Sequence, residues 1–77
     1  MNTTPQPPEA ARQTFAAALA ASMETRGYDR RQLREHLAEQ AGVKVTEQAI
    51  GAWLRAERHP RPETVAALRE LLGGFAQ

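Results

Sequence analysis

Apolar residues recur in this chain at intervals of three or four positions, and this spacing constrains the fold more than any other feature of the sequence. The first series is Phe15, Leu19 and Met23, and comparable series follow it along the chain. Such spacing places the apolar side chains on one face of an α-helix. No segment alternates apolar and polar residues for long enough to predict a strand. The sequence therefore predicts an all-α fold.

The first two helices are expected from residues that favour helix ends. Pro8 suits the first turn of a helix, which is expected to end near Arg26, with Gly27 as its stop. Asp29 is a good N-cap and predicts a second, short helix over residues 30–41.

Two further helices follow by the same reasoning. Thr46 caps a helix expected over residues 47–56, and Pro62 or Glu63 opens a fourth helix that reaches Gly73-Gly74. The chain is thus expected to form a compact four-helix domain. Its expected buried side chains are Phe15, Leu19, Met23, Leu33, Leu37, Ala41, Ile50, Trp53, Leu54, Val65, Leu68, Leu71 and Leu72.

The length of 77 residues allows one domain, which is expected over residues 8–74. Residues 1–7 are polar and rich in proline and are expected to be a flexible tail, and residues 75–77 a short C-terminal tail. The longest apolar run, residues 15–21, is too short for a membrane span, so no membrane partner is expected. The absence of cysteine excludes disulfides and favours a cytoplasmic location.

Catalytic and metal-binding patterns are not found. Ser22 is the only serine and lies within the first expected helix, and there is no cysteine nucleophile. His36 and His59 lack a second ligand at metal-binding spacing and are expected to be solvated. We therefore expect neither an enzyme nor a metal or other cofactor.

The charge distribution gives a weak pointer to a partner. The net charge of the whole chain is only +1, but residues 26–61 carry eight basic and five acidic side chains, a local charge of +3. Arg30 and Arg31 stand in the first turn of the second expected helix, where they oppose the helix dipole. Contact with phosphate would explain this placement, although solvated arginines are common.

The third expected helix has an exposed face that a DNA major groove could accept. Gln48 can bond adenine bidentately, while small Gly51 and Ala52 allow close approach of the backbone. Glu47 counts against DNA, because phosphates repel it unless it accepts from cytosine. The same positions, together with Arg55, would also suit the solvated face of an ordinary bundle helix, and periodicity does not decide between the two.

A family resemblance adds to this pattern. Gly27-Tyr28-Asp29 comes shortly before Leu33. The chain continues with Ile50-x-x-Trp53, then Pro60, and then Leu68, Leu72 and Gly73. Over residues 15–73 the chain resembles the Cro and lambda-repressor-like (XRE) helix-turn-helix family. The separation of Leu33 and Ile50 resembles a variant with a long turn, which Leu37, Gly42, Val45 and Thr46 also fit. Arg34 and Ala56 depart from the family pattern, which has a small residue and a glycine there.

The resemblance implies a sequence-specific regulator of transcription that binds double-stranded DNA, in the cytoplasm or on the nucleoid, usually as a homodimer. Repression is the direction we favour. Family members commonly have a fifth helix or a further domain for dimerisation, so the dimer surface is not identified. The implied base contacts are Gln48, Glu47, Gly51 and Ala52. The expected phosphate contacts, from the resemblance and from the charge pattern, are Arg30, Arg31, Lys44, Thr46, Arg55, Arg58 and Arg61.

Two alternatives stay open. The same helical fold could serve as a protein-interaction module, such as an antitoxin, a phage inhibitor or an adaptor, and the near-zero net charge and Glu47 favour that partner. Gly73-Gly74 could also begin a linker to a further domain.

Overall fold

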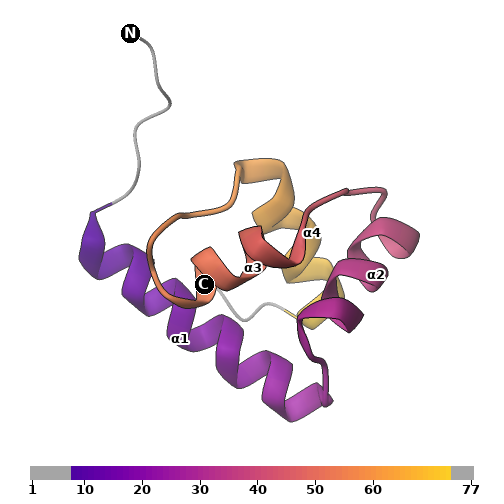
Figure 1. Ribbon diagram of the computed structural model, residues 1–77, viewed down its shortest axis with the longest axis horizontal. Helices are drawn as coiled ribbons and strands as arrows, with labels where there is room; N and C mark the ends of the chain where they lie inside the picture. Colours follow the sequence, from indigo (N-terminus) through magenta and orange to yellow (C-terminus); the bar gives the residue numbers. More distant parts are fainter. Residues whose placement is uncertain (1–7, 74–77) are drawn as a thin grey trace, which may run out of the picture.

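A computed structural model of the chain describes residues 8–73, which form four α-helices (Figure 1). These are α1 (Glu9–Arg26), α2 (Arg30–Gln40), α3 (Glu47–Leu54) and α4 (Pro62–Leu72). Residues 8–73 contain no strand, which confirms the all-α prediction for this part of the chain. None of these helices combines the length and the apolar character that crossing a bilayer requires.

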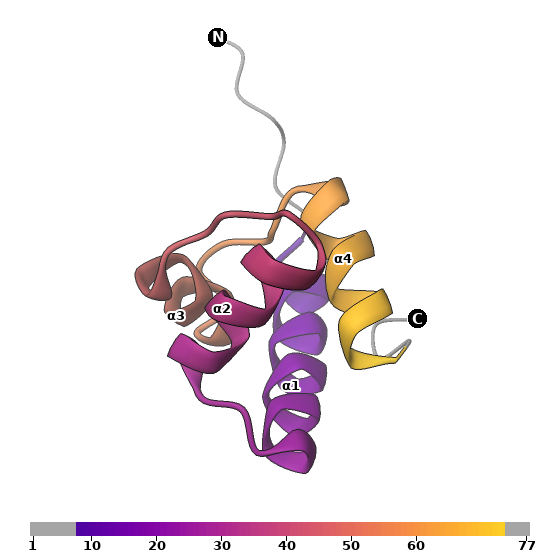
Figure 2. The same ribbon diagram turned by 90° about the vertical axis from the view of Figure 1, so that its right-hand side faces the viewer.

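Helix α2 lies between α3 and α4. Helix α3 contacts both α1 and α2, and α4 contacts α2. Figure 2 shows α3 and α4 on opposite sides of α2, with α1 running below them. One outer face of the domain is therefore built from α3, the start of α2 and the segment that follows α3.

The connection from α1 to α2 follows from two local signals. Gly27 adopts a left-handed conformation with φ of 74°, which glycine reaches at little cost, and it ends α1 as expected. Asp29 then accepts a hydrogen bond from the backbone N–H of Gln32 at 2.8 Å. The Gln32 side chain accepts one from the Asp29 N–H at 2.9 Å, so the two residues form a capping box.

Helix α2 ends one residue earlier than expected, at Gln40. Ala41 has a φ of −115°, and Gly42 then takes a left-handed φ of 67°. The N–H of Val43 bonds the Leu37 carbonyl at 3.0 Å, which turns the chain away from the helix axis. Ala41 is consequently exposed, and its expected burial is wrong.

Helix α3 begins where Thr46 predicts, since the Thr46 hydroxyl accepts a hydrogen bond from the Ala49 N–H at 3.0 Å. It ends at Leu54, two residues before the expected end. Ala56 has a φ of 62° and is the one residue other than glycine in residues 8–73 with a positive φ. An alanine thus takes a conformation typical of glycine at the position where the resembled family has a glycine.

The core lies between the four helices. Leu19, Leu33, Leu37, Ile50 and Leu68 are fully buried, and Phe15, Met23, Trp53 and Leu72 are nearly so. Three further expected core residues, Leu54, Val65 and Leu71, are only half-buried and pack against this cluster. Burial of Ala16, Thr64 and Ala67 was not expected from the apolar stripes. Most of the predicted core is thus confirmed, and the one expected core residue that is exposed, Ala41, lies just beyond the end of α2.

Candidate nucleic-acid interface

The outward face of α3 is narrower than the sequence predicts. Glu47 and Gln48 are exposed on its first turn, and Ala52 is half-buried one turn later. Gly51 is buried, because the side chains of Arg30 and Arg55 cover α3 at this position. A methyl group at position 51 would lie 2.7 Å from Nη1 of Arg30 and 3.2 Å from Nη1 of Arg55. The Arg30 side chain therefore reaches from the start of α2 across the α3 backbone.

Glu47, the residue least suited to DNA, has a basic neighbour on the adjacent helix. Its carboxylate lies 3.9 Å from Nη1 of Arg34 in α2, and both side chains are partly exposed. Arg34 occupies the position where the resembled family has a small residue. This ion pair joins α2 to the start of α3 and offsets the charge of Glu47 locally, which lessens its repulsion of a polyanion.

Two of the expected phosphate contacts already engage carboxylates. Arg31 lies 3.8 Å from Glu35 one turn along α2. Arg55 donates hydrogen bonds to both carboxylate oxygens of Glu57, at 3.1 and 3.3 Å. These hydrogen bonds, together with the charge of Arg55, hold the pKa of the Glu57 carboxyl below its usual range. Arg55 would have to leave Glu57 to hold a phosphate.

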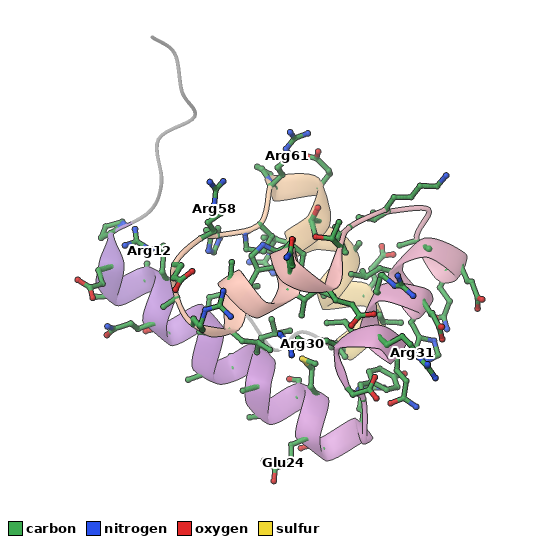
Figure 3. All side chains as sticks on the ribbon, viewed as in Figure 1. Arg12, Glu24, Arg30, Arg31, Arg58 and Arg61 are labelled. Atoms are coloured by element: carbon green, nitrogen blue, oxygen red, sulfur yellow. The ribbon has the colours of Figure 1, made fainter. Side chains whose placement is uncertain are left out.

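The other expected cationic contacts, Arg30, Lys44, Arg58 and Arg61, are exposed. No carboxylate of residues 8–73 forms an ion pair with any of them. Figure 3 shows Arg58 and Arg61 on one side of α3 and Arg30 on the other, whereas Arg31 lies beside α2. Arg30, Arg58 and Arg61 are thus brought together around one helix. Thr46 lies at the start of the same helix, where its hydroxyl serves as the N-cap.

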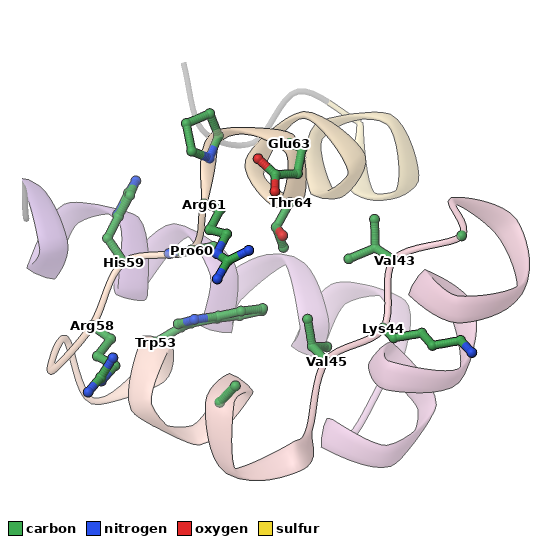
Figure 4. Close-up of a pocket in the computed structure, with 13 residues that line it drawn as sticks. Val43, Lys44, Val45, Trp53, Arg58, His59, Pro60, Arg61, Glu63 and Thr64 are labelled. Atoms are coloured by element: carbon green, nitrogen blue, oxygen red, sulfur yellow. The ribbon is translucent and has the colours of Figure 1, made fainter. Parts of the chain in front are cut away.

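A hollow of about 1030 Å³ adjoins this face (Figure 4). The segment before α3, with Val43, Lys44 and Val45, forms one wall, and the segment after α3, with Arg58 and Pro60, forms another. No sequence pattern indicates this hollow, because its walls come from segments on either side of α3 in the chain.

The two histidines are not solvated in the way the sequence suggests. The His59 ring packs edge-on against Phe15, with ring centroids 4.8 Å apart. Burial, and then the charge of nearby Arg12, lower the pKa of His59. His36 stacks on Tyr28 at 4.6 Å and bonds the Gln40 side chain at 3.0 Å. In residues 8–73 no group of three or more potential ligand side chains could hold a metal ion.

Comparison of the chain with models of known protein families, with curated proteins and with solved structures finds no match.

Proposed function

We propose that this protein is a sequence-specific regulator of transcription, acting as a repressor, that binds double-stranded DNA with α3 in the major groove. The observation that carries the proposal is the exposed first turn of α3, flanked on both sides by Arg30, Arg58 and Arg61. A major groove admits one helix, and the phosphates on its two edges would meet cations at such positions.

Base reading is assigned chiefly to Gln48. Its side chain is exposed on the first turn of α3, and an amide there can bond the N6 and N7 edge of adenine. Ala52 is accessible enough to touch a thymine methyl, and Glu47 can accept from cytosine when Arg34 releases it. Gly51 would contribute only as the place where Arg30 crosses α3.

Phosphate contact is assigned first to Arg30, Lys44, Arg58 and Arg61, whose charges no carboxylate of residues 8–73 offsets in an ion pair. Arg31 and Arg55 would join them by exchanging a carboxylate for a phosphate. Thr46 has its hydroxyl committed to the helix cap, so its contact with phosphate would come second to that role.

The proposal is tested by selecting bound sequences from a randomised duplex pool. An enriched motif is expected, and a palindromic or repeated motif would indicate a homodimer. Gln48→Ala should lose about 1–3 kcal/mol of discrimination at one base pair of that motif. If Gln48→Ala binds every variant of the motif as the wild type does, the role of Gln48 is wrong.

Salt dependence tests the phosphate contacts separately. Affinity for duplex DNA should fall steeply with salt, and Arg58→Gln should weaken all sequences alike and reduce the salt slope by about 1. Arg69→Gln is the matched control, because it removes the same charge from α4, on the other side of α2 from α3. Absence of duplex binding at low salt would contradict the proposal and favour a protein-interaction module.

A further inference from the structure

The hollow beside α3 has the mixed lining that small-molecule sites have. Apolar side chains, from Val43, Val45, Ala49, Trp53 and Pro60, make up about half of its lining, and polar or charged side chains make up the rest. Its volume of about 1030 Å³ lies just above the range, roughly 300–1,000 Å³, that is typical of ligand sites. Such sites add a few polar groups that fix the ligand's orientation.

Thr64 supplies one such group. Its side chain belongs to the first turn of α4, only 5% of the residue is exposed, and its hydroxyl is directed into the hollow (Figure 4). The Thr64 backbone N–H bonds the Arg61 carbonyl at 2.9 Å, but its hydroxyl makes no hydrogen bond to any residue of 8–73. The hydroxyl oxygen itself is not fully buried, so it is open to the hollow and can form a hydrogen bond with a ligand there.

The charges around the hollow favour an anion. The positive end of α4, an 11-residue helix, opens at the hollow, and no side chain caps it. The exposed side chains of Lys44, Arg58 and Arg61 also line it. Glu63 is the one carboxylate in the lining and opposes an anion, but three cations outnumber it.

We infer that this hollow binds a small organic anion, in which a carboxylate or a phosphate is attached to a compact apolar group. The apolar group packs against Val43, Val45 and the edge of Trp53. The oxyanion accepts a hydrogen bond from Thr64 and is attracted by the start of α4, Arg58 and Arg61. The inference does not depend on DNA binding, and its test contains no DNA.

Four probes test the contributions of the apolar ring and of the negative charge separately. Benzoate and phenyl phosphate carry a ring with a carboxylate or a phosphate, benzamide carries the ring without the charge, and inorganic phosphate carries the charge without the ring. Each is titrated into the full-length protein labelled with ¹⁵N. The signals followed are the backbone amides of Lys44, Val45 and Thr64 and the indole N–H of Trp53, the only tryptophan.

At least one of the two ring-bearing anions should shift these signals in a saturable way, about tenfold more tightly than benzamide or inorganic phosphate. The tighter of the two identifies the natural oxyanion as a carboxylate or a phosphate. Equal binding of benzamide, or no saturable shift with either anion, would overturn the inference.

Variants locate the site. Thr64→Val should weaken binding of the better anion about fivefold and leave the fold about as stable as the wild type, since the hydroxyl forms no hydrogen bond with residues 8–73. Arg61→Gln should weaken binding, and Glu63→Gln should strengthen it. Arg26→Gln removes the same charge as Arg61→Gln but lies at the end of α1, outside the lining, so it should leave the affinity unchanged. If Thr64→Val and Arg61→Gln bind the anion as the wild type does, the hollow is not its site.

Discussion

Arg12, in α1, donates a hydrogen bond from its Nε to the backbone carbonyl of Ala56 at 3.0 Å, and the two residues are 44 positions apart in the sequence. The acceptor belongs to the residue that turns the chain out of α3 in a left-handed conformation. The bond therefore ties the first helix to the exit of the proposed recognition helix. It also helps to hold the segment that carries Arg58, His59 and Arg61.

The left-handed Ala56 predicts that a glycine there stabilises the protein. The methyl group of alanine makes this conformation about 1–2 kcal/mol less favourable than it is for glycine. Glycine also has greater freedom in the unfolded chain, which offsets about 0.4–1 kcal/mol of that difference. Ala56→Gly should thus raise the free energy of unfolding by up to about 1.6 kcal/mol, measured by chemical denaturation. A lower free energy of unfolding in the variant would contradict the strain that we assign to Ala56.

The role of Thr46 as an N-cap can be measured through protein stability, separately from any contact with DNA. Because its hydroxyl accepts from the Ala49 N–H at 3.0 Å, Thr46→Ala should lower the free energy of unfolding by about 0.5–2 kcal/mol. Thr46→Asn keeps an N-cap acceptor and should recover most of that loss. Thermal or denaturant unfolding of the two variants measures the difference. If Thr46→Ala unfolds like the wild type, the cap contributes nothing, and phosphate contact would be the better explanation of the threonine.

His59 predicts a loss of stability in mild acid. Its pKa in the folded protein is lowered by burial and by Arg12, so the unfolded chain binds the proton more readily. The stabilisation is therefore present above the unfolded pKa of about 6.5 and is lost as pH falls through it towards the lower folded pKa. The free energy of unfolding should decline between about pH 7 and about pH 5 by a larger amount in the wild type than in His59→Gln.

His36→Gln is the matched control for this prediction, since it removes the other histidine and leaves the contact of His59 with Phe15. This variant should keep the decline that His59 causes. Equal slopes for the wild type and His59→Gln would mean that protonation of His59 is not coupled to unfolding.

The helix starts could be predicted from the sequence because their causes are local. Asp29 and Thr46 each accept a hydrogen bond from a backbone N–H three residues further on. The end of α1 is local in the same way, because Gly27 itself adopts the left-handed conformation there. The end of α3 could not be predicted in this way, because alanine does not favour the conformation that Ala56 adopts. The glycine of the resembled family at that position was the one signal for it.

The candidate sites depend on contacts between helices, which periodicity does not report. Gly51 lies on the outward side of α3 by its spacing, but Arg30 covers it from the neighbouring helix. From its residue type alone, Thr64 would be expected at the surface. In the structure it is buried, beside the segments on either side of α3. The cations around α3 could be expected from the sequence. That Arg31 pairs with Glu35 and Arg55 with Glu57 could be learned only from the structure.

The crossing of Arg30 over Gly51 predicts that stability and DNA binding change in opposite directions. Alanine is about 1 kcal/mol more favourable than glycine inside a helix, and the Arg30 guanidinium, the end of a flexible side chain, can move aside. Gly51→Ala should therefore unfold at higher denaturant concentration than the wild type. Displacing Arg30 moves a proposed phosphate contact, so the same variant should bind duplex DNA more weakly at every sequence.

The double variant Arg30→Ala with Gly51→Ala checks the cause of this second effect. Once Arg30 is absent, adding the methyl group at position 51 should weaken DNA binding much less than it does in the wild type. The comparison is a double-mutant cycle, with affinity measured on one duplex at fixed salt. If Gly51→Ala weakens binding equally with and without Arg30, the methyl group obstructs the DNA directly, and position 51 itself faces the groove.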